Sequence, residues 1–132
     1  MVVLAIDPGS KKSGVALVSS DAGILRRAIV PVEKLKEYCR EFVQGTAVDA
    51  VIVGGSTGSK AVCAAVSEAL GVQPVTVDER YTTERAKMRY FSDNPPRGWR
   101  RWLPSGLLYP PVPFDDYAAV IMAEDYIESI IR

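Results

Sequence analysis

The sequence contains no histidine. This absence excludes the Ser–His and Cys–His pairs of nucleophilic hydrolases, and it excludes every metal site that uses imidazole ligands. Acid–base or metal chemistry must therefore rest mainly on aspartate and glutamate. Cysteine is also scarce, and Cys39 and Cys63 lack the spacing of a metal site. We expect both to be reduced residues that pack in the protein interior.

Long hydrophobic runs are missing as well. The longest, such as residues 2–6 and 51–53, are far shorter than the roughly 20 apolar residues that span a bilayer. No signal peptide is evident, because the first strand-like run leads directly into Asp7-Pro8-Gly9. We therefore expect a cytoplasmic protein that has no membrane partner. At 132 residues and 48% hydrophobic content, residues 1–132 suit a single globular domain.

The formal net charge is zero, but the charge is unevenly distributed. Within residues 80–101, Glu84 and Asp93 are outnumbered by basic residues, namely Arg80, Arg85, Lys87, Arg89, Arg97, Arg100 and Arg101. From residue 102 onward, Arg132 stands alone against the acidic residues Asp115, Asp116, Glu124, Asp125 and Glu128. This pattern argues against a global surface for polyanions and favours a local one beside an acidic centre.

Apolar periodicity and turn residues predict an α/β fold. The predicted strands are residues 2–6, 14–18, 24–30, 48–53 and 74–77. Helices are predicted between Pro31 and Gly45, over 61–70, after Thr82 or Thr83, and over 114–131, with a proline-rich irregular segment at 92–113. The last helix has one apolar stripe, which consists of Ala119, Met122, Ala123, Tyr126, Ile127 and Ile130. This order predicts a mixed five-stranded sheet, three antiparallel strands followed by two parallel ones, flanked by helices.

Acidic residues occur where α/β sheets usually build sites. Asp7 ends the first strand, Asp78-Glu79 ends the fifth, and Asp115-Asp116 opens the last helix. Converging carboxylates repel one another unless a cation lies between them, and oxygen ligands suit Mg²⁺ or Mn²⁺. Each position also has a plainer interpretation: Asp7 as a turn residue, Asp115 or Asp116 as a helix cap, and the acidic pair at 78–79 as surface charge.

Three motifs resemble those of the YqgF/RuvX family, whose RNase H-like members are described as Holliday junction resolvases and as nucleases that mature small-subunit ribosomal RNA precursors. The motifs are DPGSKKSGVA at residues 7–16, VTVDERYTT at 75–83 and DDYAA at 115–119. They occur in the family's order and extend over nearly the whole chain. Two departures mark a divergent member: GGSTGSK at 54–60 replaces the family's Gly-x-Pro loop, and segment 92–113 is unusually rich in proline and tryptophan.

The resemblance implies an RNase H-like fold and a metal-dependent endonuclease that acts on structured nucleic acid, with Mg²⁺ or Mn²⁺ as cofactor. It implies that Asp7, Glu79 and Asp115 bind metal and catalyse, with Asp116 as a substitute or supplement for Asp115. The choice of Glu79 over Asp78 rests on the family alone. Ribosomal RNA processing is the leading role that we expect, and junction resolution is second. Resolving a junction needs two cuts, which favours a homodimer.

Several residues are candidates for substrate binding. Lys11 and Lys12 lie in the turn after Asp7, where they either contact phosphates or form a solvated hairpin tip. A basic and aromatic cluster after the fifth strand can neutralise phosphates and stack on unpaired bases, although one tryptophan packing on the core explains it equally well. The cluster consists of Arg97, Trp99, Arg100 and Arg101. Arg80 either contacts the substrate or pairs with a site carboxylate.

Other functions stay open at this point. The glycine-rich loop at 54–58 precedes a helix and can hold a phosphate through backbone N–H groups, although a plain loop and helix cap is the simpler interpretation. The same fold can also serve as a non-catalytic module that binds nucleic acid or protein. An actin-like kinase is disfavoured, because such enzymes close two lobes around a nucleotide and 132 residues provide only one.

Overall fold

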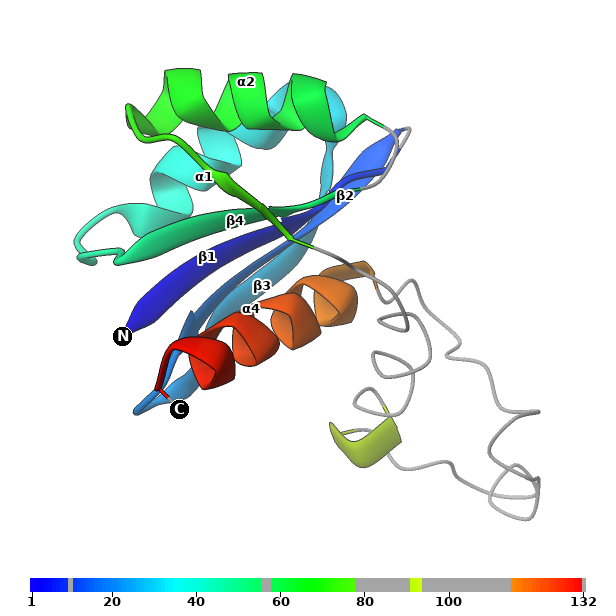
Figure 1. The fold of residues 1–132 in the computed structure, drawn as a ribbon. Helices are drawn as coiled ribbons and strands as arrows, with labels where there is room; N and C mark the ends of the chain where they lie inside the picture. Colours follow the sequence, from blue (N-terminus) through cyan, green and yellow to red (C-terminus); the bar gives the residue numbers. More distant parts are fainter. Residues whose placement is uncertain (10, 56–57, 78–90, 94–114, 132) are drawn as a thin grey trace, which may run out of the picture.

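The protein forms one mixed sheet with helices on both faces (Figure 1). This computed structural model describes residues 1–9, 11–55, 58–77, 91–93 and 115–131. The strands are β1 (Val2–Asp7), β2 (Lys12–Ser19), β3 (Gly23–Pro31), β4 (Ala50–Gly54) and β5 (Val75–Val77). Their order across the sheet is β3-β2-β1-β4-β5. The first three strands are antiparallel neighbours, whereas β1, β4 and β5 are parallel, which confirms the predicted sheet.

The described helical elements are the 3-10 turn η1 (Val32–Lys34), α1 (Leu35–Val43), α2 (Ser59–Leu70) and α4 (Asp115–Ile131). Helix α2 ends where the sequence predicts, because Gly71 adopts φ +69° and its N–H donates to the carbonyl of Ser67 at 2.8 Å. Residues 91–93 are also helical, although the sequence predicts an irregular segment from residue 92. The helix predicted after Thr82 or Thr83, and residues 94–113 of the predicted irregular segment, lie outside the described residues.

Strand β1 is buried on both of its faces because it lies in the middle of the sheet. Its alternating side chains enter two separate cores. Leu4 and Ile6 face α1 and α2, whereas Val3 and Ala5 face α4, and all four are fully buried. Figure 1 shows the corresponding layers, with α1 and α2 above the sheet and α4 below it.

Helix α4 packs closely on the sheet because its inner positions are small or flexible. Ala119, Met122 and Ala123 are buried against the sheet, as their spacing predicts. The prediction for Ile130 is wrong, since its side chain is 55% exposed. Residue 130 lies in the last turn of the helix, which ends at Ile131.

The two cysteines are free thiols, as the sequence predicts. Cys39 is buried in the core beneath α1, and Cys63 on α2 is partly buried. None of the helices in the described part of the chain has the length and apolar character needed to cross a membrane.

Candidate functional site

The last residue of β1 is Asp7, and the alternation of the strand places it on the face covered by α4. It is half-buried. On one side it pairs with Gly14 of β2, and on the other side the parallel register of β1 and β4 continues to Gly54. Neither neighbour carries a side chain, so the strands beside Asp7 add no bulk next to its carboxylate.

The turn after Asp7 requires glycine at position 9. A Cβ atom there would collide with the backbone carbonyl oxygen of Lys12. The turn is also tied to η1, because the N–H of Val32 donates to the carbonyl of Lys11 at 3.0 Å. Lys11 and Lys12 are both exposed on this turn. The structure therefore places these two predicted phosphate contacts beside the strand end that carries Asp7.

Helix α4 begins at Asp115, at the end of the sheet where β1 finishes (Figure 1). The helix then runs back toward the amino-terminal end of β1. Its first turn thus brings an acidic residue to the same end of the sheet as Asp7. For Asp115 the structure describes the backbone position alone.

Asp116, by contrast, has a well-defined set of contacts. Its Oδ2 accepts from Arg27 Nη1 of β3 at 2.9 Å, and its Oδ1 accepts from the backbone N–H of Tyr117 at 3.0 Å. The Asp116 side chain is 8% exposed and that of Arg27 is 42% exposed. The Arg27 guanidinium also lies 4.4 Å from the centre of the Tyr117 ring. These contacts attach the first turn of α4 to β3.

Arg27 is not among the site residues predicted from the sequence. One feature of the sequence does point to it: Arg27 is a cation inside a predicted strand, on the face that the last helix covers. A charge in that position needs an opposite charge close by. Neighbouring Arg26 points to the other face and donates to the backbone carbonyl of Glu41 at 2.8 Å. The two adjacent arginines therefore bind different helices.

The remaining predicted site residues fall outside the described part of the chain. They are Glu79, Arg80, Arg97, Trp99, Arg100 and Arg101. Within the described residues, no three acidic or cysteine side chains gather into a group that could hold a metal ion. The predicted Mg²⁺ or Mn²⁺ site thus needs other acids besides Asp7. Of these, Glu79 lies outside the described residues, and Asp115 is described by its backbone alone. An oxygen donor at a strand end, with glycine at the adjoining position of each neighbouring strand, fits such an ion.

The glycine-rich loop after β4 forms one backbone hydrogen bond with strand β5. The N–H of Gly55 donates to the carbonyl of Val77 at 2.9 Å, so this amide is already used and does not point at a phosphate. Gly58, with φ +91°, starts α2. At these two positions the interpretation as a plain loop and helix cap holds.

Comparison with known proteins gives matches among solved structures only. No protein-family model and no curated protein sequence matches the chain. A structure of Thermus thermophilus RuvC aligns with a TM-score of 0.59 and 19% identity, covering 93% of this chain and 90% of that one. A structure of T. thermophilus RuvC in complex with Holliday junction substrate aligns with a TM-score of 0.61 and 20% identity, covering 98% and 96%. The chain therefore has an RNase H-like fold that matches RuvC over almost its whole length.

Proposed function

We propose that this protein is a metal-dependent endonuclease that hydrolyses phosphodiester bonds in structured nucleic acid. The observation that carries the proposal is the position of Asp7, at the carboxyl end of the central strand and on the face where α4 begins with Asp115. The match to RuvC supports it, because one of the RuvC structures that align with this chain holds a Holliday junction substrate.

The proposed catalytic and metal-binding residues are Asp7, Glu79 and Asp115. Glu79 comes two residues after β5, and β5 is parallel to β1 through β4. Parallel strands present their carboxyl ends at one edge of a sheet, so β1 and β5 end at the same edge, and this supports Glu79 as a partner of Asp7. Between them β4 ends in Gly54, so that strand places no side chain at its end to separate the two acids.

These carboxylates would hold Mg²⁺ or Mn²⁺, which would supply positive charge to stabilise the attacking and leaving oxygens of the phosphate. The chain's own cations bind the substrate. Lys11 and Lys12 are exposed beside Asp7 and can hold the backbone phosphates on either side of the cut. Beyond the described ranges, we include Arg80, Arg97, Arg100 and Arg101 as further phosphate contacts and Trp99 as a surface on which an unpaired base stacks.

Asp116 takes a structural role in this proposal. Both of its oxygens already accept hydrogen bonds, one from Arg27 and one from the Tyr117 amide. An ion would have to compete with the guanidinium for the same carboxylate. These contacts support Asp115 as the metal-binding member of the adjacent pair.

Two substrates follow from different arguments. The resemblance of the motifs to the YqgF/RuvX family favours precursor ribosomal RNA, and the fold match to RuvC favours four-way DNA junctions. The chemistry of both reactions is the same, so the acidic residues do not choose between them. Junction resolution would additionally require a homodimer that makes two symmetric cuts.

Cleavage of both substrates tests the proposal. Labelled precursor ribosomal RNA and synthetic four-way junctions are incubated with the protein in Mg²⁺ or Mn²⁺, and again with excess EDTA. We expect wild-type cleavage that EDTA abolishes and that Asp7→Asn slows by about 10³-fold, equivalent to about 4 kcal/mol of transition-state stabilisation. Asp21→Asn is the matched control, since Asp21 lies in the exposed turn between β2 and β3. If wild type binds both substrates and cuts neither, the fold serves here as a binding module.

A further inference from the structure

The guanidinium of Arg27 contacts two consecutive residues in the first turn of α4. It donates from Nη1 to Asp116 Oδ2 at 2.9 Å, and it lies 4.4 Å from the centre of the Tyr117 ring. The other oxygen of Asp116 accepts from the backbone N–H of Tyr117 at 3.0 Å. This N–H is in the first turn, where backbone N–H groups have no partner inside the helix. One side chain of β3 and one of α4 thus connect the sheet with the backbone of the first helical turn.

These contacts lie ahead of the point where α4 enters the core. Ala119 is the first residue of the helix that belongs to the core between α4 and the sheet. From there on, buried side chains such as Met122 and Ala123 hold the helix in place. Helix ends open more readily than helix centres, so the first turn needs contacts of its own, and Arg27 supplies some of them.

The Arg27 contacts lie close to the proposed metal site. Through the pairing of β3 with β2 and of β2 with β1, Arg27 is level with Ala5 across the sheet. Asp7 is two residues farther along β1, a rise of about 7 Å. Asp115 directly precedes Asp116 on α4. Arg27 therefore holds the immediate neighbour of one proposed ligand from a position near the level of the other.

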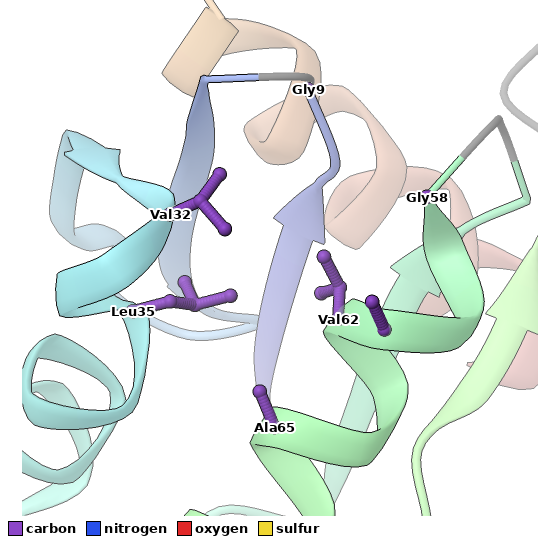
Figure 2. Close-up of a pocket in the computed structure, with 7 residues that line it drawn as sticks. Gly9, Val32, Leu35, Gly58, Val62 and Ala65 are labelled. Carbon is purple, nitrogen blue, oxygen red and sulfur yellow. The ribbon is translucent and has the colours of Figure 1, made fainter.

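The opposite face of the sheet has an apolar cavity beside the turn that follows Asp7. The cavity has a volume of about 320 Å³ and lies between η1 and α2, with Gly9 and Gly58 at one end (Figure 2). Its other lining residues are Val32, Leu35, Ala61, Val62 and Ala65. No described residue that lines the cavity is charged, so the cavity supplies no ion pair to fix that end of the site.

We propose that Arg27 is a positioning residue for the metal site. It holds Asp116 and Tyr117 against the sheet, and in this way it keeps Asp115 at the end of the sheet where Asp7 lies. The inference rests on the proposed function, in which Asp7 and Asp115 bind the metal. Without the ion pair, the first turn has to become ordered as the metal binds, and the cost of that ordering lowers the affinity for metal.

Binding of Mn²⁺ in the absence of nucleic acid tests this. Free Mn²⁺ has an electron paramagnetic resonance signal that largely disappears on binding, so a titration gives the dissociation constant and the number of sites. Asp7→Asn identifies the proposed site, because it should remove it. We expect Arg27→Met to raise the dissociation constant of this site about tenfold, as the loss of a residue that holds a metal ligand does. Arg27→Lys keeps the charge but loses the flat group over the Tyr117 ring, so it should raise the constant about threefold.

Arg26→Met is the matched control. Arg26 donates to the backbone carbonyl of Glu41 on the other face, so this variant should bind Mn²⁺ as wild type does. A purely structural role of Arg27 would lower the number of sites with the folded fraction, which circular dichroism measures, and leave the affinity of the folded protein unchanged. In cleavage assays, Arg27→Met should need about tenfold more Mn²⁺ for half of its maximal rate, while that maximal rate falls by less than about threefold.

The outcomes separate this inference from the nuclease proposal. Weaker Mn²⁺ binding by Arg27→Met but not by Arg26→Met supports the positioning role even if wild type cuts neither substrate, in which case only the nuclease proposal falls. Unchanged affinity in folded Arg27→Met overturns the positioning role and leaves the nuclease proposal intact; if that variant does not fold, the same criterion applies to Arg27→Lys. Tighter binding would show that Asp116, once released, is itself a ligand, and it would overturn the positioning role as well. A wild-type protein that binds no Mn²⁺ overturns both proposals.

Discussion

At the scale of single residues, the adjacent acids of α4 should respond differently to substitution. Asp115→Asn should lower the cleavage rate by about 10³-fold with little change in stability, because it removes a proposed metal-binding charge. Asp116→Asn keeps the shape of the side chain and removes its charge opposite Arg27, so it should destabilise the fold while leaving measurable cleavage. Cleavage rates and urea unfolding of both variants check this. A folded Asp116→Asn protein that is as inactive as Asp115→Asn would contradict the assignment.

The two thiols should also differ in reactivity. Burial raises the pKa of the Cys39 thiol from 9.0 to about 12, so at pH 8 it is almost wholly protonated and unreactive. Partly exposed Cys63 should therefore take up iodoacetamide first, which mass spectrometry of the labelled protein shows, and Cys63→Ser should abolish the fast phase. Because the unfolded thiol ionises near pH 9 and the folded one near 12, the contribution of Cys39 to stability is lost as pH rises across that window. Rapid modification of Cys39 in the folded protein would contradict this.

At the scale of elements, one ion pair contributes to the attachment of α4 to β3. Arg27→Met leaves the carboxylate of Asp116 nearly buried and without its guanidinium, and we expect a loss of about 1–3 kcal/mol in the free energy of unfolding. Arg26→Met is the matched control, since it removes an exposed hydrogen bond to a backbone carbonyl and should cost about 0.5 kcal/mol or less. Urea denaturation measures both.

A double variant separates the ion pair from simple loss of packing. In Arg27→Met with Asp116→Asn, no unpaired charge is left in the interface, so part of the stability should return. Equal destabilisation by Arg27→Met and Arg26→Met would show that the ion pair does not hold the helix.

The sequence is sufficient to predict most elements, and the reasons are local. Continuous apolar runs at 2–6 and 14–18 and the turn residues between them predict the antiparallel strands, and Gly71 predicts the end of α2. The Arg27–Asp116 pair could not be predicted in this way, because its members are 89 positions apart and meet only when α4 packs on the sheet. Ile130 fits the apolar stripe but is exposed, because periodicity does not show where the covered face ends.

At the scale of the whole molecule, α4 is the only described helix that covers its face of the sheet. Ending the chain at residue 114 should uncover an apolar surface that includes Val3, Ala5, Ala16, Val18 and Ile52. We expect the shortened protein to bind the dye ANS strongly and to aggregate, as fluorescence and light scattering would show. A peptide of residues 115–131 added in excess should reduce the dye signal. A shortened protein that stays monomeric and binds no dye would contradict this account.

The candidate site was only partly predictable at this scale. The position of Asp7 could be predicted because a strand end and a turn are local features. That α4 begins at the same end of the sheet depends on the direction in which the helix crosses the sheet, which the sequence does not specify. The roles of Glu79 and of the basic and aromatic cluster remain predictions.

Asp7 lies on the first strand, whereas α4, the helix that covers its face of the sheet, is the last of the described elements. This order has a consequence for synthesis. A ribosome makes β1 long before α4, so a nascent chain carries Asp7 while that face of the sheet is still bare. Domains generally fold as units, and this one lacks half of its core until the last helix emerges. Under the proposed function, a nascent chain without α4 would lack Asp115, so the proposed metal site would be incomplete during translation.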